Sequence, residues 1–439
     1  MICVSTRGAA PAVPFGEALL AGLAPDGGLY VPSSLTTLTS EAWNSLRGRS
    51  LADIGTTLLA PLLGEEMAVG DLHALLADAL DFPIPVVSLD ERLSVVELFH
   101  GPTFAFKDVG ARVLARLLSH FHDPGQPPLT VLVATSGDTG GAVAHAFHRV
   151  PRTRVVVLYP DGQVSAVQEA QFTTLGDNVT AAAVNGTFDD CQRLAKAAFA
   201  SPSLRRRANL TSANSISLGR LLPQMVYYAH LALQVGPEPC PLVSVPSGNF
   251  GNLAAGLLAR QMGVAIEQLH AATTVNDTVP RFLASGRVEP RASVPTLANA
   301  MDVGDPSNLE RIRWMFADDM EALRRVVSAS VHTDEDVRVA IRELDGRYGY
   351  VADPHTAIAY LGARRWLDRA GVPRATFLST AHPAKFAETV GPILGRTVSL
   401  PAALAEAMAR RPRIVRVPPR LDALTPLLLQ APGADRHPA

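Results

Sequence analysis

The stretch LVSVPSGNFGNLAAGLLARQMG, residues 242–263, decides the fold class. It passes from a short apolar run through a glycine-rich turn into an apolar, helix-like segment. A second stretch, LTVLVATSGDTGGAVAHAFHRV at residues 129–150, repeats this order. Strands buried on both faces read as continuous apolar runs, and helices between them imply parallel crossovers. We therefore expect an α/β protein with a doubly wound sheet, and a small-molecule site at the carboxyl ends of its strands.

Other apolar runs extend this pattern along the chain. We expect further strands at residues 153–160, 179–184, 269–274 and 375–380. Residues 1–82 differ, because they combine turns with helical patterns, including leucines along one helical face in residues 70–82. Two prolines follow directly and mark a boundary. The sequence predicts a mostly helical N-terminal domain over residues 1–84, an α/β region over 85–411 and a peripheral, Pro- and Arg-rich tail over 412–439.

Composition excludes several classes of function. The 439 residues are 47% hydrophobic and 18% charged, which excludes a mainly disordered chain. A net charge of −2 offers no basic excess for nucleic acid or anionic lipid. The chain has no apolar run of roughly 18 residues and no secretory-signal pattern, so we expect no membrane contact and a cytoplasmic location. We expect a monomer or a homodimer. Three well-separated cysteines and histidines without H-E-x-x-H spacing predict neither disulfides nor a metal site.

Lysine is scarce in this chain. Among the 39 Lys and Arg residues, only Lys107, Lys196 and Lys385 are lysines, and coding bias accounts for this without any function. Chemistry that needs a deprotonatable amine therefore has only three side-chain candidates. Lys107 stands at the start of a predicted helix behind Phe104 and Phe106, where an apolar setting and a positive helix end lower an amine's pKa. Lys196 has the pattern of a solvated helix position, whereas Lys385 competes with Lys107 as the reactive amine.

The glycine-rich turn SGNFGN at residues 247–252 is the strongest local indication of a ligand site. Gly248 and Gly251 let successive backbone amides converge on an anion at a helix N-terminus. The turn matches neither G-x-x-x-x-G-K-[ST] nor G-x-G-x-x-G, which disfavours nucleoside triphosphates and a nicotinamide dehydrogenase. A phosphate monoester fits better, with Asn252 either capping the helix or adding a side-chain donor. The alternative without function is a tight turn with a helix cap.

The turn SGDTGG at residues 136–141 is a second candidate. The hydroxyls of Ser136 and Thr139, with the neighbouring amides, could bind a carboxylate or a phosphate. Asp138 would repel an anion if it pointed inward, so we expect it to face another donor or to cap the helix.

A third candidate lies in SANSISLGRLLPQ, residues 212–224. Arg220 follows Asn214 by six residues, so both side chains could reach one pocket. Arginine is the natural bidentate partner of a phosphate or carboxylate, although any one of 36 arginines is a weak candidate by itself.

Taken in order, these segments resemble the threonine synthase family, pyridoxal-phosphate (PLP) enzymes of the tryptophan-synthase-β-like fold (fold type II). The resemblance implies a fold of two doubly wound subdomains, the smaller at roughly residues 110–205, beside the helical N-terminal domain. STRG and DGGLYVP are typical of the longer bacterial and fungal branch. The segments that carry the resemblance are STRG (5–8), DGGLYVP (26–32), ELFHGPTFAFKD (97–108), SGDTGGA (136–142), SANSISLGRLLPQ (212–224), PSGNFGN (246–252), DVGDPSN (302–308), DPHTAIAY (353–360) and STAHPAKF (379–386).

The resemblance also implies residue roles. Lys107 matches the catalytic Schiff-base lysine, which decides between Lys107 and Lys385. Asp138 stands where many relatives in the wider fold carry Asn, a difference that bears on subfamily. Thr380 is placed like the hydroxyl residue that faces the pyridine nitrogen. The residues implied to bind the cofactor are Lys107, Asp138, Ser247, Gly248, Asn249, Phe250, Gly251, Asn252 and Thr380. Those implied to bind the substrate are Thr135, Ser136, Thr139, Asn214, Ser215 and Arg220.

The implied activity is the last step of threonine biosynthesis, the conversion of O-phospho-L-homoserine and water into L-threonine and phosphate. Two alternatives stay open. One is another reaction on the same scaffold, either a lyase that makes 2-oxobutyrate from this substrate or a threonine dehydratase. The other is an inactive binding or scaffold protein, which the retention of Lys107, both glycine-rich turns and Arg220 disfavours.

Overall fold

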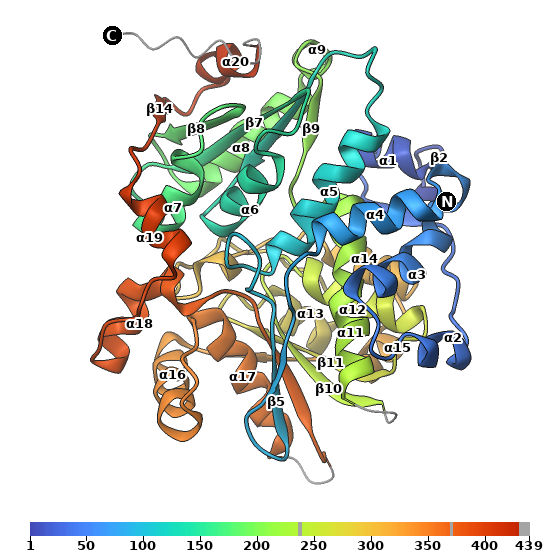
Figure 1. The fold of residues 1–439 in the computed structure, drawn as a ribbon, viewed down its shortest axis with the longest axis vertical. Coiled ribbons are helices and arrows are strands. Elements are labelled where there is room, and N and C mark those ends of the chain that lie inside the picture. The colour runs from blue at the N-terminus through green and yellow to red at the C-terminus, as the bar shows by residue number, and fades with distance from the viewer. Residues whose placement is uncertain (236–238, 369–371, 430–439) are drawn as a thin grey trace.

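The computed structural model describes residues 1–235, 239–368 and 372–429. Figure 1 shows two α/β layers, with the smaller sheet toward the top, the larger sheet toward the bottom and the N-terminal helices along one side. In the part of the chain that is described, no helix combines the length and the apolar character needed to cross a membrane.

The larger sheet confirms the predicted parallel α/β architecture. Its six strands lie in the order β12-β11-β10-β13-β5-β4, and all neighbours are parallel except the antiparallel pair β4 and β5. The central strands carry the continuous apolar runs read from the sequence, whereas the shorter β4, β5 and β12 were not expected. The strands are β4 (Val86–Ser88), β5 (Leu93–Glu97), β10 (Cys240–Pro246), β11 (Ile266–Thr273), β12 (Val327–Val331) and β13 (Ala375–Ser379).

The smaller sheet is entirely parallel. Its order is β14-β8-β7-β6-β9, with the three expected strands at its centre. The segment from residue 412 is not separate from this layer, because it supplies the edge strand β14 and a helix, α20 (Leu421–Leu429), which packs against α8. Residues 430–439 of the predicted tail lie outside the described residues. The strands are β6 (Leu129–Ala134), β7 (Thr153–Pro160), β8 (Val179–Val184), β9 (Leu210–Ser212) and β14 (Ile414–Val417).

The elements of residues 1–82 are mostly helical, as predicted, and also include a small sheet that was not expected. A three-stranded antiparallel sheet, β2-β1-β3, accompanies four helices. These strands are two to four residues long, too short to show an alternating pattern. The expected apolar face is present, since Leu72 and Leu76 are fully buried. The elements are β1 (Ile2–Ser5), β2 (Val13–Pro14), α1 (Phe15–Ala21), β3 (Tyr30–Pro32), α2 (Ser40–Ser45), α3 (Leu51–Leu63) and α4 (Val69–Ala79).

Helices cover the sheets and join them through one continuous apolar core. That core includes Leu58 of the N-terminal helices, Val113 between the layers, and Val131 and Val243 of the two sheets. The helices nearest the site are α5 (Lys107–Phe121), α6 (Asp138–Phe147), α7 (Ala166–Thr173), α10 (Leu218–Leu221), α11 (Met225–Gln234), α12 (Gly251–Gln261) and the 3-10 helix η4 (Pro383–Phe386). The others include α8 (Phe188–Ala200), α9 (Pro202–Arg207), α13 (Thr278–Ser285), α14 (Leu309–Met315), α15 (Met320–Val326), α16 (Asp334–Tyr348), α17 (Pro354–Leu367), α18 (Ala387–Leu394) and α19 (Ala402–Ala409).

Candidate active site

The predicted site segments converge at the carboxyl ends of β6, β10 and β13. The loop before α5 is tied to the end of β13, since the Phe106 amide donates to the Thr380 carbonyl at 2.8 Å and the His382 amide to the Phe104 carbonyl at 3.0 Å. On the other side, the SGNFGN turn reaches the SANSISLG segment, because Asn249 Nδ2 donates to the Ser215 hydroxyl. These contacts bring together segments that lie 34 positions apart in one case and more than 250 in the other, at the edge where the parallel strands end.

Lys107 is the first residue of α5, as predicted. Its side chain retains 13% exposure, and Nζ lies 5.3 Å from the centroid of the Phe106 ring. Nζ also faces Asp138 Oδ2 at 3.5 Å. Burial lowers the pKa of the Lys107 amine, and the positive charges of Lys385 and Arg220 add to this effect, while Asp138 opposes it. The lowering of the pKa has the direction expected from the sequence, and desolvation is its main cause.

The other two lysines differ sharply from Lys107. Lys196 is exposed on α8, beside the smaller sheet. Lys385 is fully buried in η4, where Nζ donates to the Thr103 carbonyl at 2.8 Å and pairs with Asp138 Oδ1 at 2.7 Å. Lys385 is thus committed to protein partners, and Lys107 is the site lysine that keeps partial access.

Asp138 faces other donors, which is one of the two arrangements expected from the sequence. Its Oδ1 accepts from Gln168 Nε2 at 2.8 Å as well as from Lys385. The positive charges of Lys385 and Lys107, with these hydrogen bonds, outweigh the cost of burial and hold the pKa of the carboxyl well below its ordinary value. Asp138 is therefore an ionised carboxylate that lies between the two lysines, Lys385 and Lys107.

The SGNFGN turn forms an open anion cradle. Phe250 adopts the left-handed conformation, φ 61°, directly before α12 begins at Gly251. Gly248 packs so closely on the 298–302 segment that a Cβ there would lie 2.6 Å from the Met301 Cα. Within the described residues, none of the amides from Gly248 to Asn252 donates to a protein acceptor. The turn thus presents a run of unused N–H groups at the positive end of an 11-residue helix.

Asn252 does not cap α12. Of the two roles expected for it, the structure leaves that of a side-chain donor. Its Oδ1 accepts hydrogen bonds from the hydroxyls of Tyr227 and Tyr228, both at 2.7 Å. These bonds fix the amide, and its buried Nδ2 has no acceptor among the described residues. A buried donor without a partner is costly, so the site is built to receive an acceptor.

Residues not singled out from the sequence hold the cradle in place. Asn308 Nδ2 donates to the Asn249 carbonyl at 3.0 Å, and the Ser307 amide donates to Asn249 Oδ1 at 2.6 Å. Arg311 is fully buried and donates to Asn308 Oδ1 at 2.7 Å. The DVGDPSN motif ends at Asn308 and was the only available indication, since these contacts span about sixty residues of chain.

The SGDTGG turn is shaped by Thr135. Its hydroxyl accepts from the amides of Gly137 at 3.0 Å and Gly140 at 2.8 Å. Because these hydrogen bonds lie within the turn, Thr135 stabilises the turn itself. Ser136 and Thr139 stay half-buried at its surface and are the hydroxyls left to face a ligand.

Arg220 lies in α10, beside α5. The guanidinium is buried, donates from Nη1 to the Ala213 carbonyl at 2.8 Å, and leaves Nε without an acceptor among the described residues. Burial lowers its pKa to about 10. Asn214 and Ser215 are half-buried in the preceding turn. A buried guanidinium that forms no ion pair in the described part of the chain suits an anionic ligand.

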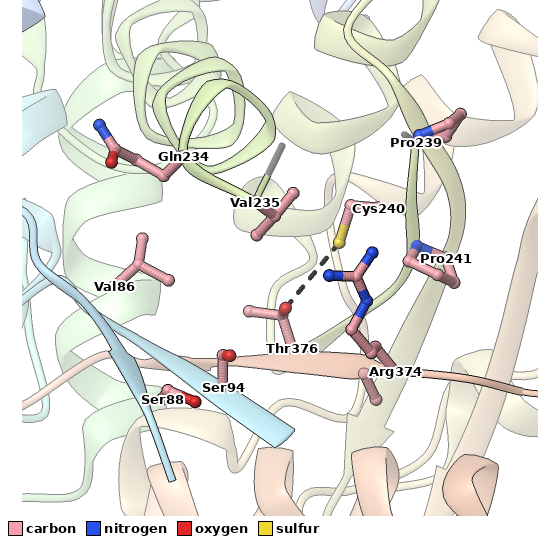
Figure 2. Close-up of a pocket in the computed structure, with 11 residues that line it drawn as sticks. Val86, Ser88, Ser94, Gln234, Val235, Pro239, Cys240, Pro241, Arg374 and Thr376 are labelled. Carbon is pink, nitrogen blue, oxygen red and sulfur yellow. Dashed lines mark hydrogen bonds between the residues drawn. The ribbon is translucent and has the colours of Figure 1, made fainter. Parts of the chain in front are cut away.

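A separate cavity of about 210 Å³ lies at the opposite, amino-terminal ends of the larger sheet's strands. Figure 2 shows Ser94, Cys240, Arg374 and Thr376 around it, with the Cys240 thiol directed toward the Thr376 hydroxyl, 3.9 Å away. None of the predicted site residues lines it. Strand polarity therefore separates this cavity from the candidate active site.

Three family models match the chain. The model described as pyridoxal-phosphate dependent enzyme matches residues 85–380, that of the threonine synthase N terminus residues 3–80, and that of the threonine synthase C-terminal region residues 356–427. A threonine synthase from Serratia marcescens is 44% identical over 395 residues, which cover 90% of this chain and 91% of that protein.

Solved structures agree with these matches. The crystal structure of threonine synthase from Escherichia coli superposes with a TM-score of 0.92 at 40% identity and covers 98% of this chain and 99% of its own. A PLP-bound threonine synthase from Brucella melitensis superposes with a TM-score of 0.91 at 37% identity, again covering 98% and 99%.

Proposed function

Because the chain belongs to the threonine synthase family of PLP-dependent enzymes, we propose that it converts O-phospho-L-homoserine and water into L-threonine and phosphate. The observation that carries this proposal is that the partly exposed, desolvated Lys107 stands in one site with two candidate anion-binding groups, the SGNFGN cradle and, as the second, the buried Arg220 guanidinium with Asn214 and Ser215. The lysine and the cradle suit PLP, and the second group suits a substrate that itself carries a phosphate.

The residues at the cradle fit the cofactor's phosphate. The unused amides of Gly248–Asn252 and the unpartnered Asn252 Nδ2 supply donors for a dianion, with no lysine or arginine in the turn. Ser247, Asn249 and Phe250 complete this turn. Asn249 contributes by shaping it, since both ends of its side chain are already bonded.

Lys107 would attach the cofactor through its amine, and bound PLP supplies an electron sink for the carbanion formed at the substrate's α-carbon. The lowered pKa of Lys107 favours the neutral amine that attachment and proton abstraction require. Once its amine is free, Lys107 Nζ would take the α-proton, remove a β-proton, and return protons first to the γ-carbon and finally to the α-carbon. Phosphate leaves from the γ-carbon, and water adds at the β-carbon.

The two ends of the substrate have separate binding residues. Ser136 and Thr139, with the turn amides, would take the carboxylate of the amino-acid end. Arg220, with Asn214 and Ser215, would take the phosphate, because its guanidinium is buried without a carboxylate partner in the described residues. The expelled phosphate would stay there and could accept a proton from the attacking water.

Thr380 would face the pyridine nitrogen. This placement is supported by the short bond from the Phe106 amide to the Thr380 carbonyl, which fixes Thr380 beside the loop that carries Lys107. A neutral hydroxyl there would leave the ring nitrogen unprotonated and temper the electron sink.

Two measurements test the assignment of Lys107: the residue to which PLP is attached, and the turnover of a Lys107 variant. Borohydride reduction of the PLP-loaded protein should fix the cofactor on the peptide that contains Lys107. Lys107→Ala should lose the cofactor's absorbance near the visible edge together with all turnover. An adduct on Lys385, or turnover that persists in the variant, would remove Lys107 from this role.

The rival reactions are distinguished by their products. Incubation with O-phospho-L-homoserine should give threonine and phosphate in equal amounts. Accumulation of 2-oxobutyrate without threonine would favour the lyase instead. We place the reaction in the cytoplasm, supported by the three free, buried thiols. A monomer or homodimer stays a prediction.

A further inference from the structure

One carboxylate serves two of the chain's three lysines. Asp138 Oδ1 lies 2.7 Å from Lys385 Nζ and 2.8 Å from Gln168 Nε2, while Oδ2 faces Lys107 Nζ at 3.5 Å. The two oxygens are thus divided: one is saturated by fixed donors and the other is turned toward the reactive amine.

Lys385 is rigidly held in this arrangement. It has no exposure, and its ammonium also donates to the Thr103 carbonyl. That carbonyl accepts a second bond from Gln171 Nε2 at 3.0 Å, and the Thr103 amide and hydroxyl both donate to Asp108. A fully buried ammonium is retained only where it is paired, because burying an unpaired charge is strongly unfavourable.

The charged groups around Lys107 come from four elements. Asp138 stands on α6, Lys385 on η4 and Arg220 on α10. Asp108, next to Lys107 on α5, accepts from Thr103, and burial raises its pKa to about 6. Without Lys385, the Asp138 carboxylate would be left with Lys107 as its nearest cation, and a buried carboxylate favours the protonated form of an adjacent amine.

We propose that Lys385 is a positioning residue that cancels the charge of Asp138, so that Asp138 orients the Lys107 amine without holding it protonated. The proposal rests on the proposed function, in which Lys107 is the reactive amine. Gln168 assists by keeping Oδ1 turned toward Lys385. The role of Asp138 is then to aim Lys107, and the role of Lys385 is to make that contact compatible with a neutral base.

The scarcity of lysine makes a direct test practical. In cofactor-free protein, competitive acylation with trace acetic anhydride over a pH series, read by peptide mass spectrometry, follows Lys107 against an added simple amine as the internal standard. Lys385 is fully buried and should not react, whereas exposed Lys196 reports an ordinary lysine. Lys385→Gln keeps a hydrogen-bond donor on a side chain that is one bond shorter, and removes the charge.

We expect Lys385→Gln to move the Lys107 acylation midpoint upward and to slow its acylation near neutral pH by about tenfold or more, since each pKa unit changes the neutral fraction about tenfold. The double variant Asp138→Asn with Lys385→Gln removes both charges and should return Lys107 to within about threefold of the wild-type rate. Lys196→Gln is the matched control and should change neither value.

Two outcomes would overturn the proposal. One is a Lys385→Gln protein that melts like the wild type and keeps the wild-type Lys107 profile. The other is a double variant whose Lys107 midpoint differs from the wild type by more than about one pH unit, a readout that holds even if the single variant does not fold. Borohydride mapping is independent: if PLP is not on Lys107, the proposed function fails while the acylation profile still reports the Asp138–Lys385 pair.

Discussion

At the scale of single residues, Arg220 combines burial with an unfilled donor. Nε has no acceptor among the described residues, and the guanidinium is bonded to one main-chain carbonyl. We expect Arg220→Ala to raise the KM for O-phospho-L-homoserine by roughly ten- to a hundredfold, since a hydrogen bond to a charged group contributes about 1.5–3 kcal/mol. PLP content, measured by absorbance, should stay at one per chain. Loss of the cofactor instead would assign Arg220 a structural role, and Arg206→Ala on the surface of α9 is the control.

At the scale of elements, the strand–turn–helix units could be predicted from the sequence because their signals are local. Apolar runs, glycines and helical spacing lie within about twenty residues of one another, and they located Lys107, the SGNFGN turn and the SGDTGG turn. The contacts that complete the site are not local. Lys385 reaches Thr103 across 282 positions, and Asn308 reaches Asn249 across 59. Sequence periodicity does not predict such long-range contacts. From the sequence, Lys385 could therefore be considered only as an alternative to Lys107 as the reactive amine.

The cradle's dependence on close packing gives an element-scale prediction. Gly248→Ala would place a Cβ 2.6 Å from the Met301 Cα, and the obstacle is backbone, which cannot rotate away. The turn must shift, at a cost of about 1–3 kcal/mol, and its amides would lose their alignment. We expect PLP affinity, titrated by absorbance, to fall about tenfold or more. Gly346→Ala on α16 adds a Cβ into open space and should bind PLP like the wild type; equal affinity in both variants would contradict the cradle.

At the scale of the whole molecule, burial lowers the pKa of several histidines that lie far apart in the sequence. Burial lowers the pKa of five of them below the ordinary 6.5, in three cases to about 4: His122, His145, His230, His332 and His382. Their contribution to stability is complete above the unfolded pKa and is lost as pH falls toward the folded pKa. Asp108 and Asp302 act in the opposite sense, because burial raises their pKa to about 6 and the folded chain gains protons there first.

Five histidines have a lowered pKa and favour unfolding in acid, whereas two carboxyl groups have a raised pKa and oppose it. The histidines therefore outnumber the carboxyl groups by three. We therefore expect the melting temperature of the cofactor-free protein, followed by scanning calorimetry, to fall stepwise from pH 7 through 6 to 5. His332→Gln keeps a partner for the Ser330 hydroxyl and should make this fall shallower, because one of the lowered groups is gone. His73→Gln on the exposed face of α4 controls for the substitution. A melting temperature that rises on acidification would mean that Asp108 and Asp302 outweigh the histidines.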